Sequence, residues 1–180
     1  MFNKVCIIGC GLIGSSLARA IKKNNLSNKI VSSNRSEATN RRVIELRIVD
    51  DSSTNTKKMV KDSDLVIIAT PLSSYESVIL KIKDSLKNGS ILTDVGSVKE
   101  KIINLVEKFV PMDVSWIPSH PIAGTEESGP NAGFAELFNN RWCIITPSEK
   151  AKKQDIKILE AFWKKIGRSE ERRVGKECRS

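Results

Sequence analysis

The sequence predicts a doubly wound α/β fold, in which helices cover both faces of a mainly parallel sheet. Short β-branched runs alternate with amphipathic stretches of helical length, which is the order of repeated βαβ units. The run DLVIIA at residues 64–69 is the clearest of the predicted strands. With 180 residues, of which 39% are apolar and 28% charged, the chain is long enough for one domain with its own core.

The first βαβ unit is predicted at the N-terminus. Residues 5–8 (VCII) form a β-branched run that stops at glycines, as a buried strand does. A helix follows, because Ile13, Leu17 and Ile21 recur at helical spacing. Residues 29–33 predict the second strand.

The later elements continue this alternation. Ser36 is the predicted N-cap of a helix that runs to about Arg47. A further short strand is predicted at residues 48–49. The long Gly/Pro-rich segment 118–133 is expected to be a loop. After the strand at 64–69, the predicted elements are a helix carrying Val78, Ile79, Ile82 and Leu86, a strand at 90–93, a helix at 98–109, strands at 115–117 and 143–146, and a final helix at about 148–166.

Five polar or glycine-rich segments each follow a predicted strand. In open parallel sheets, ligands bind beyond the carboxyl ends of the strands, so we expect these segments to converge on one edge. They are residues 9–14, 34–35, 70–71, 94–97 and 119–126.

Residues 9–14 (GCGLIG) match the G-x-G-x-x-G pattern of dinucleotide-binding turns. The first glycine allows a tight turn, the second lets a pyrophosphate approach the backbone, and the third lets helix and strand pack closely. A tight turn without a ligand is the alternative, but the place between a strand and a helix favours a Rossmann-like nucleotide site. The predicted cofactor-binding residues are Gly9, Gly11, Leu12, Ile13, Gly14, Asn34, Arg35, Thr70 and Pro71.

The choice between NAD and NADP stays open. About twenty residues after the turn, where an acid often binds the ribose 2′-hydroxyl, the chain has Asn34 followed by Arg35. Asn34 can hydrogen-bond a hydroxyl group but does not repel a phosphate, and Arg35 could pair with a 2′-phosphate. We expect NAD, with NADP as the alternative.

His120 is the only histidine in the sequence, so any imidazole chemistry must use it. It lies in the segment PSHPIAGTE, whose prolines exclude a regular helix; a loop histidine bonded to the backbone is the alternative. Ser97 also follows a predicted strand, where its hydroxyl could cap the helix at 98–109. Their place at the ligand edge of the sheet favours a functional role for both.

Four motifs together resemble the prephenate dehydrogenases, the tyrosine-biosynthesis enzymes that include arogenate and cyclohexadienyl dehydrogenases. The resemblance runs from about Lys4 to Gly167. Many dehydrogenases share the glycine turn, whereas the last two motifs in this order are highly specific. The motifs are GCGLIGSS at residues 9–16, ATP at 69–71, DVGSVK at 94–99 and SHPIAGTEESG at 119–129.

The resemblance implies oxidative decarboxylation of prephenate to 4-hydroxyphenylpyruvate, with hydride transfer from ring C4 to nicotinamide. It implies that His120 accepts a hydrogen bond from the C4 hydroxyl, and that Ser97 holds the same hydroxyl and positions the histidine. Thr125 and Glu126 are the expected substrate contacts, although a solvated loop carboxylate is the alternative for Glu126. The choice between prephenate and arogenate as substrate stays open. Two alternative functions also stay open: another Rossmann dehydrogenase of the β-hydroxy acid type, and a non-catalytic nucleotide-sensing module.

The resemblance also implies a helical C-terminal domain that makes the dimer and supplies arginine to the substrate carboxylates. We therefore expect residues 1–167 to be the nucleotide-binding domain of a homodimer whose helical domain is missing here, and the fragment alone to be poorly active. Residues 168–180 (RSEERRVGKECRS) resemble a translated sequencing adapter and are expected to be non-native, with a natural basic tail as the alternative. Since they carry five basic and three acidic residues, the net charge without them falls from +9 to +7.

Composition argues against several other classes of function. The pI of about 9.5 suggests a polyanion partner, but the lysines at 150–153 and 164–165 follow a helical pattern without interleaved stacking aromatics, which favours a solvated helix face. No apolar run is long enough to cross a bilayer. The four cysteines lack the spacing of a zinc site or a disulfide framework, so we expect reduced thiols in a cytoplasmic protein. We expect no nucleic acid, membrane or metal partner.

Overall fold

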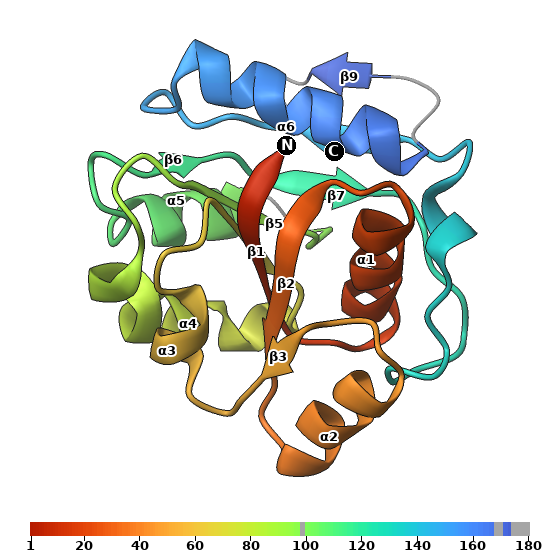
Figure 1. The fold of residues 1–180 in the computed structure, drawn as a ribbon. Coiled ribbons are helices and arrows are strands. Elements are labelled where there is room, and N and C mark those ends of the chain that lie inside the picture. The colour runs from red at the N-terminus through yellow and green to blue at the C-terminus, as the bar shows by residue number, and fades with distance from the viewer. Residues whose placement is uncertain (98–99, 168–170, 174–180) are drawn as a thin grey trace.

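The main sheet has six strands, and all of their pairings are parallel. In the computed structural model, which describes residues 1–97, 100–167 and 171–173, the strand order is β3-β2-β1-β4-β5-β6 (Figure 1). The order reverses between β1 and β4, at the switch point where such sheets bind ligands. The predicted doubly wound sheet is confirmed. Its strands are β1 (Phe2–Ile8), β2 (Ser27–Ser33), β3 (Asp51–Ser52), β4 (Leu65–Ile68), β5 (Ile91–Asp94) and β6 (Ser115–Trp116).

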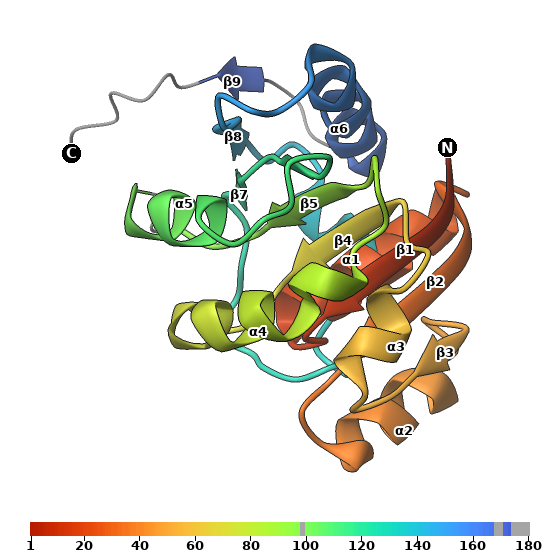
Figure 2. The same ribbon diagram turned by 90° about the vertical axis from the view of Figure 1, so that its left-hand side faces the viewer.

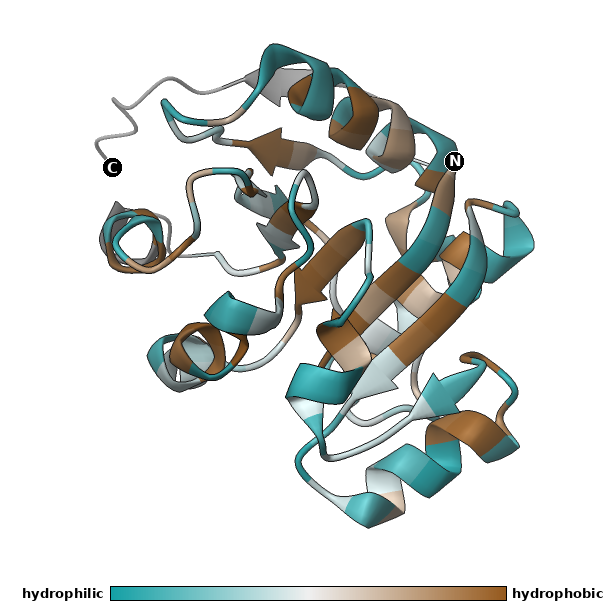
Figure 3. Cartoon of the chain, turned by 60° about the vertical axis from the view of Figure 1, so that its left-hand side comes forward, coloured by the Kyte–Doolittle hydropathy of each residue, from teal (hydrophilic) through white to brown (hydrophobic). Residues whose placement is uncertain are grey.

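Helices cover both faces of this sheet, because successive strand residues face opposite sides. Val5 and Ile7 of β1 belong to one core cluster with α1 and α6, whereas Cys6 and Ile8 belong to another with α3, α4 and α5. Figure 2 looks onto the face that α3 and α4 cover, and Figure 3 shows that hydrophobic residues dominate the central strands. The helices are α1 (Leu12–Lys23), α2 (Glu37–Glu45), α3 (Thr56–Val60), α4 (Tyr75–Ile82), α5 (Glu100–Glu107) and α6 (Lys153–Ile166), with single 3-10 turns η1 (Leu72–Ser74), η2 (Lys83–Ser85) and η3 (Ala135–Phe138).

A second, smaller sheet lies beside the main one. Its order is β7-β8-β9, where β7 (Ser119–Pro121) runs antiparallel to β8 (Cys143–Ile145) and β8 runs parallel to β9 (Glu171–Arg173). The prediction of a continuous loop over residues 118–133 is therefore wrong at β7. The partner of β7 lies far along the chain, with Ser119 opposite Ile145, so no local pattern indicates the strand.

The segment after α2 also differs from the expectation. The strand predicted at residues 48–49 is wrong, because Ile48 and Val49 are buried in the turn that follows α2, and the strand forms at β3. Arg47 has a positive φ of 52°, which turns the chain sharply and delays the strand. The five-residue helix α3, capped by the side chain of Asn55, was not predicted. Among the described residues, no helix is both long and apolar enough to span a membrane.

Candidate active site at the carboxyl edge of the sheet

The five segments that the sequence singles out meet at one edge of the main sheet. Four of them follow β1, β2, β4 and β5, whose carboxyl ends lie together because the strands are parallel. The fifth, residues 119–126, begins in the second sheet. It is tied to the end of β5, since the Ser119 amide donates a hydrogen bond to Asp94 Oδ1 at 3.0 Å.

Two glycines of the turn after β1 are required by packing, and one borders open space. A Cβ atom on Gly9, where φ is +93°, would lie 2.8 Å from the Ala69 carbonyl oxygen. A Cβ atom on Gly14 would lie 2.0 Å from the Gly9 carbonyl oxygen. A Cβ atom on Gly11 would meet no atom of the described chain within 4 Å. The space beside Gly11 is therefore available to a ligand that approaches the backbone.

The N-terminus of α1 opens onto this space. Gly11 is the N-cap residue and contributes no side-chain cap, and the first turn contains no acidic residue. The amides of the first turn and the helix dipole are thus left for an anion, as a pyrophosphate requires. Beside the turn, Thr70 Oγ1 is a buried atom without a hydrogen-bond partner among the described residues. These residues fit a dinucleotide at the switch point.

Asn34, which the sequence assigns to the cofactor ribose, is buried and hydrogen-bonded within the protein. Its Oδ1 accepts from the Cys10 amide at 2.6 Å, and its Nδ2 donates to Asn40 Oδ1 at 3.0 Å and to two serine hydroxyls. The side chain thereby ties the glycine turn to the end of β2, while its neighbour Arg35 is exposed. Burial raises the pKa of the Cys10 thiol to about 11, so the turn carries no thiolate at neutral pH.

The predicted catalytic residues Ser97 and His120 lie on two segments that share one buried carboxylate. Asp94, at the end of β5, is fully buried; its Oδ2 accepts from the Gly96 amide at 2.9 Å, and its Oδ1 accepts from Ser119. Ser97 is exposed in the bend after β5, and His120 is half-buried in β7. Residues 98–99 lie outside the described residues, so capping of α5 by Ser97 stays a prediction.

The strand that carries His120 is also held by the core. Ser119 Oγ lies 2.9 Å from Thr93 Oγ1 and accepts a hydrogen bond from Trp163 Nε1 of α6 at 3.2 Å. Both Thr93 and Trp163 are buried. The backbone at His120 is therefore attached to β5 on one side and to α6 on the other.

A cavity of about 340 Å³ adjoins His120 and is lined by His120, Pro121, Ile122, Ala123, Gly124 and Arg141. Thr125 and Glu126, the predicted substrate contacts, are exposed and lie just beyond this lining. Arg141 is a lining residue that the sequence reasoning missed. Only the pairing of β7 with β8, which brings residues 141–143 beside residues 121–123, could have indicated it.

The arrangement combines an anion-binding helix N-terminus with a hydroxyl and an imidazole at the same edge of the sheet. Such a set can hold a dinucleotide and accept a proton from a substrate hydroxyl. Within residues 1–97, 100–167 and 171–173, no group of three or more His, Cys, Asp or Glu side chains could hold a metal ion.

Comparison with protein sequences shows what the chain is similar to. The sequence model of a family described as prephenate dehydrogenase, nucleotide-binding domain, matches residues 17–170. A cyclohexadienyl dehydrogenase of Zymomonas mobilis is 36% identical over 167 residues, which are 93% of this chain and 57% of the relative. A prephenate dehydrogenase of Bacillus subtilis is 32% identical over 165 residues, which are 91% of this chain and 44% of the relative. The chain thus spans about half the length of the curated relatives it matches.

Solved structures show the same fold. The crystal structure of prephenate dehydrogenase from A. aeolicus in complex with hydroxyphenyl propionate and NAD+ has a TM-score of 0.89 and 25% identity, and the match covers 97% of this chain and 60% of that one. The crystal structure of Synechocystis arogenate dehydrogenase has a TM-score of 0.84 at 24% identity, covering 96% of this chain and 59% of that one. The latter likeness concerns the fold alone.

Proposed function

The chain belongs to the prephenate dehydrogenase family, whose nucleotide-binding domain it matches, and from this membership we propose that the complete protein oxidatively decarboxylates prephenate to 4-hydroxyphenylpyruvate with NAD. One observation carries the proposal. The bend with Ser97 and the strand with His120 are attached to the same buried carboxylate, at the edge that also carries the glycine turn. A nucleotide-binding turn without catalysis would not need that arrangement.

The glycine turn, the N-terminus of α1 and Thr70–Pro71 hold NAD in this proposal, and bound NAD supplies the hydride acceptor. Gly11 leaves room for the pyrophosphate, and the amides of Leu12, Ile13 and Gly14 face it. The complex of the A. aeolicus enzyme with NAD+ supports NAD as the cofactor. Asn34 acts by fixing the turn, and the exposed Arg35 is the residue placed to meet a 2′-phosphate if NADP binds.

His120 receives the proton of the substrate C4 hydroxyl as hydride leaves C4, because that oxygen becomes carbonyl-like. An imidazole is suited to this step, since its ordinary pKa of about 6.5 lies near neutral pH. Ser97 holds the same hydroxyl and orients it toward the ring nitrogen. When the C–C bond to the ring carboxylate breaks and carbon dioxide leaves, the electron pair makes the ring aromatic, and His120 returns the proton to the phenolate oxygen.

The surroundings of the site give the remaining parts of the proposal. Thr125 and Glu126 contact substrate at the mouth of the site, beyond the cavity that His120 lines. Arogenate is the second candidate substrate, because a relative from Methanocaldococcus jannaschii that is 30% identical over 125 residues is described as a probable arogenate/prephenate dehydrogenase. The complete protein is cytoplasmic in this proposal, as the cysteine pattern suggests, and it is a homodimer, as the family resemblance implies.

The test is an assay of the protein expressed from its complete reading frame. We expect NADH formation with prephenate, a smaller rate with arogenate, and a lower KM for NAD than for NADP. A preference for arogenate or for NADP would correct the substrate or the cofactor. Binding of NADH without turnover of either substrate would contradict the proposal and favour a nucleotide-sensing module, and turnover of a β-hydroxy acid instead would favour the rival dehydrogenase class.

A further inference from the structure

Asp94 joins two segments that bear separate catalytic residues. We propose that Asp94 is a positioning residue, which holds the bend carrying Ser97 and the strand carrying His120 in a fixed relation to one another. This inference rests on the proposed function for its catalytic consequence. It gives Asp94 no contact with substrate or cofactor.

Two of the hydrogen bonds that Asp94 accepts come from matching positions in the sequence. Its Oδ2 accepts from the amide of Gly96 at 2.9 Å, and Gly96 immediately precedes Ser97. Its Oδ1 accepts from the amide of Ser119 at 3.0 Å, and Ser119 immediately precedes His120. One carboxylate therefore fixes the backbone directly before each catalytic residue, although the two residues are far apart in the chain.

A carboxylate is suited to this task because both of its oxygens only accept hydrogen bonds. Asp94 is fully buried, and charge-assisted bonds are stronger where water is excluded. A third donor, the Tyr75 hydroxyl, lies 3.1 Å from Oδ2. Burial and the nearby Asp94 charge raise the pKa of Tyr75 well above its usual range, so this hydroxyl stays protonated and donates.

The bend packs closely against the carboxylate and its neighbours at Gly96. A Cβ atom on Gly96 would lie 2.7 Å from Leu72 Cδ2 and 3.0 Å from both Asp94 Oδ2 and the Tyr75 hydroxyl. On the other side, Ser119 is held by Thr93 and Trp163 through its hydroxyl. Asp94 is consequently bonded directly to the backbone of both segments, each of which is packed or bonded further within the core.

Asp94→Asn tests the inference because an amide offers only one acceptor oxygen. The asparagine oxygen can keep the bond to Gly96 or the bond to Ser119, but not both. At the remaining position its NH2 group would face a backbone N–H, and two donors form no hydrogen bond. Tyr75→Phe is the matched control, since it removes the third donor and keeps both backbone bonds. Gly96→Ala is the second variant, because a Cβ atom there would lie 3.0 Å from Asp94 Oδ2 and would push the bend with Ser97 and the carboxylate apart.

Two readouts separate positioning from simple loss of folded protein. In this chain the single histidine gives one set of imidazole NMR signals, which we expect to shift or broaden in Asp94→Asn and to stay unchanged in Tyr75→Phe. In the complete protein we expect kcat per NADH-binding site to fall at least about tenfold in Asp94→Asn and Gly96→Ala, with the NADH dissociation constant changed less than about threefold. Tyr75→Phe keeps kcat within about threefold.

Unchanged imidazole signals and unchanged kcat in a folded Asp94→Asn variant would overturn the inference. Should that variant bind no NADH because it has not folded, Gly96→Ala decides, and a wild-type kcat there would equally overturn it. A wild-type protein that does not oxidise prephenate would contradict the proposed function instead, and the imidazole comparison would still decide whether Asp94 holds the strand of His120.

Discussion

Gly9, Gly11 and Gly14 meet different physical demands within one short turn. The backbone of Gly9 is left-handed and touches Ala69, and Gly14 touches the carbonyl of Gly9. Neither position tolerates a side chain, with or without a ligand. Gly11 faces open space, so its lack of a side chain matters only when something binds there.

Substitution by alanine is therefore expected to affect a different property at each position: the free energy of unfolding at Gly14 and nucleotide binding at Gly11. Gly14→Ala should lower the free energy of unfolding by about 3 kcal/mol, because its methyl group overlaps a backbone oxygen. Gly11→Ala should change it by less than about 1 kcal/mol, the scale of an N-cap replacement, yet weaken NADH binding at least about tenfold. Urea unfolding followed by tryptophan fluorescence and NADH titration measure the two effects. Equal losses of stability in both variants, or unweakened NADH binding in Gly11→Ala, would contradict the assignment of the open space to the pyrophosphate.

The glycine turn can be predicted from the sequence because its backbone requirements depend on neighbouring residues. The contacts of Asn34 cannot, because they are made with residues of other elements. Its partners Cys10 and Asn40 come from other elements, and the pattern alone suggested a contact with the ribose. Likewise, the lone histidine was identifiable by counting, but its place in a strand depends on a distant partner. The contribution of Asp94 became visible only when both of its bonded amides could be located.

Among the elements, the buried central strands were the most predictable. β4 and residues 5–8 of β1 are apolar on both faces, because each supplies alternate side chains to two core clusters. The short strand β7 and the five-residue helix α3 depend instead on tertiary contacts, so no local periodicity marks them. A sequence pattern thus predicted the layers of the fold better than the element that carries His120.

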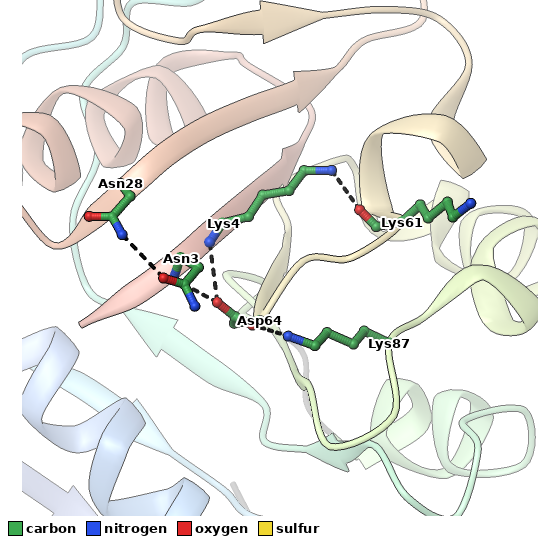
Figure 4. A network of polar contacts seen from close by, with 6 residues as sticks. All are labelled: Asn3, Lys4, Asn28, Lys61, Asp64 and Lys87. Carbon is green, nitrogen blue, oxygen red and sulfur yellow. Dashed lines mark hydrogen bonds and ion pairs between the residues drawn. The ribbon is translucent and has the colours of Figure 1, made fainter.

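A polar network joins the amino ends of β1 and β4, where the sheet has no ligand segments (Figure 4). Asp64, just before β4, accepts hydrogen bonds from the amides of Asn3 (2.6 Å) and Lys4 (3.2 Å) and from the ammonium group of Lys87. Partial burial acts to raise the pKa of Asp64, but the bonds from Lys87 and the two amides outweigh it, and the net shift is downward.

A lowered pKa in the folded state gives Asp64 a stabilising effect that is present above its unfolded pKa and lost as pH falls through the folded value. We expect Asp64→Asn to lower the free energy of unfolding by about 1 kcal/mol at pH 7, and this difference to shrink as the pH falls below the ordinary aspartate pKa of about 3.9. Urea unfolding of both proteins from pH 7 to below this pKa measures it. Asp62→Asn is the control, because Asp62 is exposed two residues away and its substitution removes a carboxylate without removing the bonds of Asp64. A difference that stays constant with pH would contradict a role for the carboxylate charge.

On the scale of the whole molecule, the second sheet and α6 bring the segment with His120 to the edge of the main sheet that carries the glycine turn. Ser119 connects β5, β7 and α6, because its amide donates a hydrogen bond to Asp94 and its hydroxyl accepts one from Trp163. A parallel sheet was predictable from the alternation of elements, and the edge that binds ligands followed from it. The attachment of β7 was not predictable, since it depends on buried polar contacts between segments distant in sequence.

The central claim is that His120 performs proton transfer beside a separate nucleotide site. In the complete protein, His120→Asn should lower kcat with prephenate about a thousandfold, within the range of general acid–base catalysis, because the amide cannot accept the hydroxyl proton. The dissociation constant of NADH should stay within about threefold of wild type, since the glycine turn is untouched. Steady-state kinetics and NADH titration of the same preparation give both values. A kcat equal to that of the wild-type protein would contradict the account.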